Sequence, residues 1–234
     1  MVTFRFSVFY LLALFSTLLI EHYIQMKKQT LISAISAVAV LTLLLVLFLQ
    51  LGGMTNEELS ENGLYVYDVP RSLNEFSLVD HNSNSINSKI LQNKWTLIFF
   101  GYTYCPDICP LTMSTLNQFS SLLKAEENYV DDTQIIMVSV DPRRDTVEKL
   151  KGYVEFFNDD YLGLTGEHIE IFKFASQLNI AFTYEVGKDE NYLVSHNGEI
   201  VLINPNGDSH GFFKTPLDPT KMAINYEAVR AAWE

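Results

Sequence analysis

Cysteine is nearly absent from this chain, which has 2 cysteines among 234 residues. A single pair excludes a disulfide framework, and it is too small to form a structural zinc site, which generally takes four protein ligands. A region of roughly 180 residues buries a sizeable core without cross-links. The two cysteines therefore need an explanation other than general stability.

Basic charge is also scarce. The chain has 16 Lys and Arg against 28 Asp and Glu, a formal net charge of −12. From residue 54 onward there are 13 Lys and Arg and 27 Asp and Glu. Such an acidic field repels phosphate backbones and anionic headgroups, so we expect no nucleic-acid partner. Metal ions and basic proteins remain compatible partners.

One long apolar run stands out against this acidic background. Residues 31–49 carry no charge and have no polar face, which favours a membrane-spanning helix over a buried core helix. Lys27 and Lys28 precede the run, whereas residues 52–60 contain no basic residue. Because basic flanks stay cytoplasmic, we expect the chain after residue 53 to lie outside. No cleavage site follows, so the helix is interpreted as a retained anchor.

A second apolar stretch, residues 6–20, is short for a span. It is either the first helix of a hairpin or the product of a misplaced start, and Met26 is the start we favour. With no Arg- and Ser-rich transit peptide, we expect a bacterial inner membrane, one or two spans and a periplasmic domain. The expected parts are an N-terminal segment (1–29), a transmembrane anchor (30–52), a tether (53–64) and a domain (65–234).

The outer region alternates apolar runs with amphipathic ones. Residues 54–75 are polar and loop-like, and residues 76–93 suggest a hairpin that turns around residues 82–87. Strands are expected at 95–100, 135–140, 161–164 and 183–186, and helices at 110–125, 145–157, 167–178 and 219–232. Asp145-Thr146, with Glu148 three residues after Asp145, is the expected start of the second of these helices.

Asn197-Gly198 lies between the apolar runs 192–196 and 199–204, which predicts a tight hairpin. Buried strands alternating with helices indicate an α/β architecture with helices on both faces of the sheet. Within this α/β class, a strand followed by a cysteine pair that opens a helix indicates a thioredoxin-like fold with a β-hairpin insertion.

Cys105 and Cys109 are four residues apart at this junction of strand and helix. At that spacing both sulfurs lie on one face of a helical turn, and the helix N-terminus lowers thiol pKa values. A structural disulfide would close too short a loop to stabilise much. A redox dithiol and a metal site are equally compatible with the spacing. Two thiolates suit Cu(I), a soft ion.

A third ligand is sought among five histidines. His22 lies by the membrane segments, His81 beside a turn, His168 in a helical turn and His210 in an expected polar loop. Most single histidines are simply surface or hydrogen-bonded residues. His196 alone follows an apolar strand at a hairpin corner, where a rigid scaffold can aim its ring. Added to two thiolates, this imidazole makes a trigonal copper site.

Asp141 ends the second buried strand, and strand ends of this kind lie where ligands bind in α/β sheets. Its carboxylate is a candidate to orient a metal ligand or attract a cationic partner. The alternative is a turn-forming Asp before Pro142, and the residues favour the two equally.

At three blocks the chain resembles the Sco/SenC family of copper-binding assembly factors. The blocks are FFGYTYCPDICP (99–110), SVDPRRDT (139–146) and VSHNGEIVLINPNG (194–207), within a resemblance that covers roughly residues 65–230. The resemblance implies a thioredoxin-like fold, a single N-terminal anchor, and one copper ion, Cu(I) or Cu(II), on Cys105, Cys109 and His196. Two departures from the family pattern are Ser195, where an acidic residue is common, and Tyr104, where histidine is common.

The resemblance implies a metallochaperone that delivers copper to the dinuclear site of cytochrome c oxidase. Its partners would be the copper-bearing subunit of the oxidase and a copper donor protein. The alternative is a thiol–disulfide reductase in which Cys105 and Cys109 reduce the copper-ligand cysteines of that subunit. A third hypothesis, a redox or copper sensor, has no direct support in the sequence beyond the acidic surface and the anchor.

Overall fold

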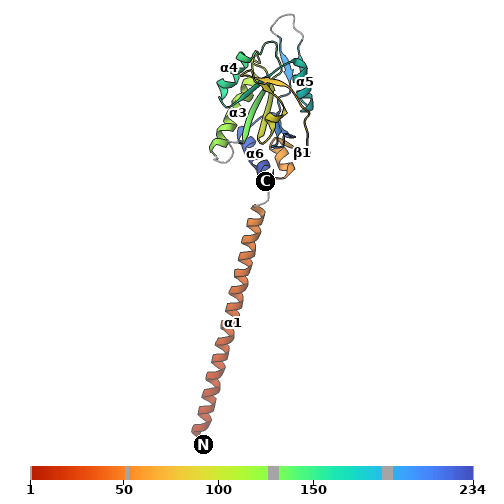
Figure 1. Cartoon of the computed structure of the whole chain (residues 1–234). Coiled ribbons are helices and arrows are strands. Elements are labelled where there is room, and N and C mark those ends of the chain that lie inside the picture. Colours follow the sequence, from red (N-terminus) through yellow and green to blue (C-terminus); the bar gives the residue numbers. More distant parts are fainter. Residues whose placement is uncertain (1, 51–52, 126–131, 186–191, 234) are drawn as a thin grey trace. The chain divides into compact units, whose positions relative to one another are not determined.

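A computed structural model describes residues 2–50, 53–125, 132–185 and 192–233 (Figure 1). The chain divides into two compact units, Met1–Gly53 and Met54–Glu234. The first contains one continuous helix, α1 (Val2–Gln50). Because residues 2–50 include neither proline nor glycine, nothing breaks the helix between the two apolar stretches, and the expected alternative of a helical hairpin is not formed. Within α1, residues Ala13–Val46 are apolar and long enough to be a candidate membrane span.

The second unit is built on an eight-stranded mixed sheet in the order β1-β10-β9-β4-β5-β6-β2-β3. Its central strand, β4 (Trp95–Gly101), is buried at every residue. It pairs parallel with β5 (Thr133–Ser139) and antiparallel with β9 (Ile200–Ile203). The remaining strands of this sheet are β1 (Leu64–Arg71), β2 (Leu78–Asp80), β3 (Ser85–Ile86), β6 (Leu162–Thr165) and β10 (Ser209–Phe213). Within the described residues, a second sheet pairs β7 (Phe182–Tyr184) with β8 (Val194–His196).

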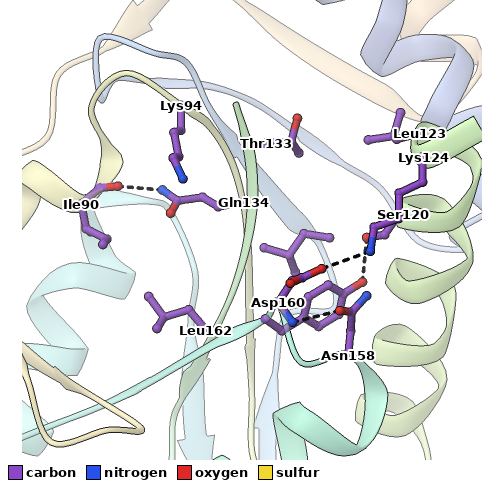
Figure 2. A pocket seen from close by; sticks show the side chains of 12 residues that line it. Ile90, Lys94, Ser120, Leu123, Lys124, Thr133, Gln134, Asn158, Asp160 and Leu162 are labelled. Carbon is purple, nitrogen blue, oxygen red and sulfur yellow. Dashed lines mark hydrogen bonds and ion pairs between the residues drawn. The ribbon is translucent and has the colours of Figure 1, made fainter. Parts of the chain in front are cut away.

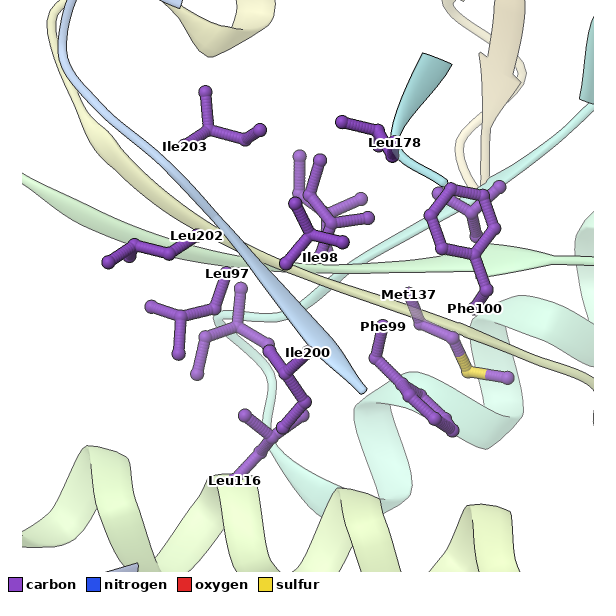
Figure 3. Close-up of a cluster of buried hydrophobic side chains, with 14 of the residues drawn as sticks. Leu97, Ile98, Phe99, Phe100, Leu116, Met137, Leu178, Ile200, Leu202 and Ile203 are labelled. Carbon is purple, nitrogen blue, oxygen red and sulfur yellow. The ribbon is translucent and has the colours of Figure 1, made fainter. Parts of the chain in front are cut away.

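Helices cover both faces of the large sheet. They are α3 (Ile108–Ala125), α4 (Val147–Phe157), α5 (His168–Gln177) and α6 (Pro219–Trp233). Alternate residues of β4 point to opposite faces. In Figure 3, Leu97 lies on the side of Leu116 from α3, whereas Phe100 lies on the side of Leu178, which follows α5. Phe100 also meets Phe174 of α5, with ring centroids 5.8 Å apart. The predicted α/β architecture with helices on both faces is confirmed.

Most of the predicted elements are confirmed to within a few residues at their ends. The expected strands correspond to β4, β5, β6 and β7, and the expected helices to α3, α4, α5 and α6. The hairpin over residues 76–93 is β2 paired with β3. A 3-10 turn, η1 (Ser88–Leu91), follows it.

The prediction that residues 54–75 are loop-like is wrong. This stretch contains α2 (Asn56–Glu61) and β1, and the compact unit begins at Met54. Thr55 and Glu58 form a capping box that starts α2, and Leu59 is buried against the core. The expected tether over residues 53–64 is therefore largely folded structure. Polarity misled the prediction because a two-turn helix needs only one buried side chain.

The predicted hairpin at Asn197-Gly198 is also wrong. The strand before this pair, β8, pairs with β7 in the small sheet, whereas the strand after it, β9, lies between β4 and β10 in the large one. All four residues of β9 are buried, so this strand needs cover on both faces, whereas β8 exposes Ser195. The Asn-Gly pair is thus a corner between two sheets. His210 belongs to β10, not to the expected polar loop, and its ring lies 5.2 Å from that of Trp95.

Candidate metal centre

The two cysteines lie where the central strand gives way to α3. Gly101 ends β4, and a Cβ there would come within 3.0 Å of the Cys109 sulfur and 2.6 Å of the Phe99 ring, so only glycine fits without a shift. The loop that follows carries Cys105, and Cys109 sits in the first turn of α3. The Cys109 backbone N–H donates to the Cys105 sulfur at 3.4 Å. Cys109 is fully buried, Cys105 is partly exposed, and both are free thiols.

His196 approaches this pair from the last position of β8. Its Nε2 lies 3.4 Å from the Cys109 sulfur. The two sulfurs and a ring nitrogen of His196 all lie within 4.8 Å of one another. The structure thus brings together the three residues that the sequence nominates as metal ligands, although His196 comes from a stretch 87 residues away from Cys109.

The histidine ring is oriented for a metal. Its Nδ1 lies 2.7 Å from the carbonyl oxygen of Asn197. Since a carbonyl only accepts hydrogen bonds, Nδ1 carries the proton and donates it, which leaves the Nε2 lone pair facing the sulfurs. The rings of Phe99 and Tyr102 meet the imidazole edge-on, with centroids 5.9 and 6.0 Å away.

The two thiols differ strongly in acidity. A hydrogen bond from the Cys109 side chain is the largest cause that lowers the pKa of Cys105, to about 3, and the backbone N–H groups of Asp107 and Cys109 lower it further. The same bond to Cys105, together with burial, raises the pKa of Cys109. The pair therefore gives up its first proton from Cys105, which is a thiolate at neutral pH.

This asymmetry predicts how the reduced protein reacts with iodoacetamide. Because only thiolate reacts, an ordinary cysteine gains about tenfold in rate per pH unit below a pKa of about 8.5. We expect the rate at Cys105 to stay flat between about pH 5 and pH 8, since its lowered pKa leaves it ionised throughout. Mass spectrometry of the modified peptides measures the rate at each cysteine. The urea-unfolded chain is the control and should show the ordinary tenfold rise; the same rise in the folded protein would rule out a Cys105 thiolate.

Asp145 supports the cysteine loop and is not the residue that caps α4, although Asp145-Thr146 was the predicted start of this helix. The residue that caps α4 is Thr146, whose side chain accepts from the Lys149 N–H. The buried Asp145 carboxylate instead accepts from the backbone N–H and hydroxyl of Thr103, at 3.0 and 2.6 Å, and from the Ser139 hydroxyl at 2.6 Å. Burial is the largest influence on the pKa of Asp145 and raises it. The carboxylate thus ties the loop that carries Cys105 to the end of β5.

Replacing Asp145 with alanine should destabilise the outer unit. Thr103 and Ser139 would lose the buried acceptor of three hydrogen bonds, and hydrogen bonds to charged groups contribute about 1.5–3 kcal/mol each, so we expect a loss of at least about 4 kcal/mol in the free energy of unfolding. Urea titration followed by circular dichroism measures it. Asp160→Ala is the matched control, because Asp160 is exposed and pairs with Lys124 on the surface, and it should cost less than about 1 kcal/mol. Equal losses in both variants would contradict a supporting role for Asp145.

Asp141, the other carboxylate nominated from sequence, is also buried, but its partners are not the ligands. It accepts from the Tyr192 hydroxyl at 2.6 Å and pairs with Arg144. The Arg144 guanidinium lies 3.7 Å above the Tyr192 ring and 5.0 Å from the Tyr104 ring. The backbone N–H of Arg144 also donates to the Asp141 carbonyl. This is the hydrogen bond of a turn, the alternative role that the sequence offers for Asp141. Asp141 therefore holds Tyr192, in the segment before β8, and Arg144, which in turn contacts Tyr104 of the cysteine loop.

The largest pocket described lies away from these residues. Its volume is about 520 Å³ and it lies beside the starts of β5 and β6 (Figure 2). Several of its polar groups already bond to one another, including Gln134 to Ile90 and Lys124 to Asp160. Cys105, Cys109 and His196 are not among its lining residues, so this pocket is no part of the metal centre.

Fold and site together define a thioredoxin-like domain that carries two thiols and an imidazole at the carboxyl end of its central strand. The SCO1/SenC family model matches residues 68–230, and the chain belongs to this family.

Three known proteins illustrate the likeness. A putative copper-binding protein of Stutzerimonas stutzeri is 33% identical over 147 residues, 63% of this chain and 71% of the relative. The crystal structure of Arabidopsis thaliana ScoI with copper bound is 31% identical and covers 68% of this chain and 98% of its own, with a TM-score of 0.62. The third is a structure of BsSco, in which a disulfide switch was identified. BsSco is described as a member of the Sco family of cytochrome c oxidase assembly proteins. It is 25% identical and covers 71% of this chain and 97% of its own, with a TM-score of 0.56.

Proposed function

We propose that this chain carries one copper ion on Cys105, Cys109 and His196 and delivers it during assembly of cytochrome c oxidase. The observation that carries the proposal is the approach of the three ligand atoms to within 4.8 Å of one another. Two soft sulfurs and one imidazole suit copper better than the hard cations. The copper-bound Arabidopsis relative and the oxidase-assembly description of BsSco support the same assignment.

The protonation states of the three side chains favour loading with a soft metal. Cys105 is already a thiolate, and the Nε2 lone pair of His196 already faces the sulfurs. Metal binding must therefore displace only the proton of Cys109.

The proposed order of copper release follows from the different solvent exposure of the two cysteine sulfurs. Cys105 is the more accessible of the two sulfurs, so ligands of a recipient can displace it first, while the buried Cys109 holds the ion until a second recipient ligand arrives. The copper-bearing subunit of the oxidase is the recipient that we propose, and a separate copper donor protein is the proposed source. Copper is cargo in this account, so its affinity must be high enough to hold the ion and low enough to surrender it.

Anaerobic titration with Cu(I) against a chromogenic chelator tests the proposal. We expect the reduced protein to take up one equivalent per chain. Failure of the reduced protein to compete for any copper would overturn the proposal. The disulfide form, prepared by mild oxidation, should take up none, because both sulfurs are then unavailable as thiolates.

The second candidate function is thiol–disulfide reduction of the recipient. The difference in acidity between the two thiols favours it, because an exposed thiolate beside a buried thiol is a nucleophile with a resolving partner. Cys105 would attack one sulfur of the recipient's disulfide and release the other as a thiolate. Cys109 would then attack Cys105, releasing the second recipient thiolate. Two electrons pass to the recipient, the pair becomes a disulfide, and a separate dithiol reductant must restore it.

The His196→Ala variant separates the two functions. Reduction uses only the sulfurs, so a disulfide-containing peptide of the recipient subunit should be reduced by this variant at close to the wild-type rate. Copper transfer to the pre-reduced recipient should fall, because the imidazole ligand is lost. Loss of both activities together would favour a combined role in which reduction and transfer share one bound state.

We further propose that residues 30–52 anchor the domain, residues 65–234, on the outer face of a bacterial inner membrane. Lys27 and Lys28 before the apolar run, and the span-length segment of α1, support this orientation. Protease added to spheroplasts should digest the domain. Digestion only after the membrane is permeabilised would reverse the orientation.

A further inference from the structure

Arg144 lies between the loop that carries Cys105 and the segment that leads to His196. Its guanidinium is 3.7 Å from the centre of the Tyr192 ring, and Tyr192 precedes His196 by four residues. The same guanidinium is 5.0 Å from the centre of the Tyr104 ring, and Tyr104 is the neighbour of Cys105 in the chain. Both distances are within the range of a cation–π contact. One side chain therefore touches both chain segments that bring the proposed ligands together.

Asp141 fixes the guanidinium and the Tyr192 ring against each other. Its carboxylate is fully buried. One of its oxygens accepts from the Tyr192 hydroxyl at 2.6 Å, and the other accepts from the Nε–H of Arg144. An arginine suits this place because its planar guanidinium pairs with a carboxylate and stacks on a ring at the same time, which a lysine ammonium does not do. Asp141, Arg144 and Tyr192 are called the Arg144 clamp below.

The strand that carries His196 depends on such contacts. In the part of the chain that the structure describes, β8 pairs with β7, in a sheet separate from the large one. The Val194 N–H donates to the Tyr102 hydroxyl at 3.3 Å, and the Tyr184 hydroxyl donates to the Val140 carbonyl at 2.7 Å. The clamp adds an ion-paired contact only two residues before β8 begins, so it fixes the point at which the chain enters this strand.

We propose that Arg144 is a positioning residue, which clamps β8 against the cysteine loop and so keeps the His196 imidazole within reach of a metal ion held on Cys105 and Cys109. The inference rests on the proposed copper site for its effect on metal binding, but the effect on β8 needs no metal. Groups that orient a metal ligand contribute to affinity without touching the ion, because they hold the ligand atom where the ion needs it.

Amide hydrogen exchange in metal-free protein tests the clamp itself. Arg144→Gln removes the charge and the stacking, so β8 should open more often, and exchange at Val194 should accelerate about tenfold. Because this change leaves a buried carboxylate unpaired, it can also weaken the fold. Tyr192→Leu is therefore the second clamp variant. It leaves the ion pair of Asp141 and Arg144 in place and should accelerate exchange at Val194 in the same way.

Arg143→Gln is the matched control. Arg143 is the neighbouring arginine and is exposed, so its replacement removes the same charge without opening the clamp. Exchange at Val194 should keep its wild-type rate in this variant. A wild-type rate in Tyr192→Leu, or an equal acceleration in Arg143→Gln, would overturn the proposal.

A double-mutant cycle with His196→Ala separates positioning from a general structural role. In the wild-type background, Tyr192→Leu should lower Cu(I) affinity about three- to tenfold, because losing the orientation of a ligand costs no more than losing the ligand. In the His196→Ala background it should have no further effect, since no imidazole is left to position. A loss of the same size in both backgrounds would overturn the positioning role. Failure of wild-type protein to bind copper would instead refute the proposed function, and the exchange rates would still decide whether the clamp holds β8.

Discussion

The Cys105→Ser variant should lose tight Cu(I) binding. A serine hydroxyl is a hard and neutral ligand, and it cannot replace the only thiolate that is already ionised and accessible at neutral pH. Removing an outer partner of a metal ligand costs about 10- to 100-fold in affinity, so removing this ligand itself should cost at least about 100-fold. Chelator competition under anaerobic conditions measures the loss, with Cys109→Ser expected to behave alike.

The fold should survive this change, which makes the result interpretable. Cys105 is partly exposed and belongs to a loop rather than to the central strand. Equal thermal melting of the metal-free variant and the metal-free wild type is the control. A Cys105→Ser variant that still bound one Cu(I) with wild-type affinity would place the copper elsewhere on the chain.

The second large effect is expected at His196. Cu(I) can remain on two sulfurs, whereas Cu(II) needs the nitrogen ligand. His196→Ala should therefore weaken Cu(I) binding by about tenfold and abolish the Cu(II) form. The measurement is the sulfur-to-copper charge-transfer absorption after addition of Cu(II), which should be present in the wild type and absent in the variant.

His168→Ala provides the comparison, because His168 is an exposed histidine at the start of α5, where its ring contacts Phe182 of β7. It leaves the cysteine pair and His196 in place, so its charge-transfer band should match that of the wild type. A band that persisted in His196→Ala but vanished in His168→Ala would show that the nitrogen ligand is His168 and not His196.

Local patterns predicted the part of the site that is local. The uninterrupted apolar run before Cys105 predicted a strand buried on both faces, and β4 confirms it. The prediction that both cysteines lie on one helical turn is wrong, because α3 begins at Ile108 and Cys105 lies in the loop before it. The structure places His196 beside the two cysteines, although the sequence argument for it used a hairpin that the structure does not form, and its role as a ligand stays a prediction.

The missed features depend on pairing between distant segments. Whether β9 pairs with β8 or enters between β4 and β10 is decided by burial across the whole sheet, which no window around Asn197 contains. Asp145 has the sequence signature of a helix cap, and only the arrival of Thr103 and Ser139 beside it turns it into a buried acceptor. In the sequence, Tyr102 looks like any aromatic residue that follows a strand. Only the folded position of β8 brings His196 against its ring.

One measurement tests the convergence of Cys105, Cys109 and His196 on a single ion most directly. X-ray absorption at the copper K-edge, recorded on the Cu(I)-loaded chain, reports which atoms surround the metal. We predict a shell of sulfur scatterers with one nitrogen from imidazole, and loss of the imidazole signal in His196→Ala alone. A shell of nitrogen and oxygen without sulfur, or a spectrum unchanged by His196→Ala, would contradict the account.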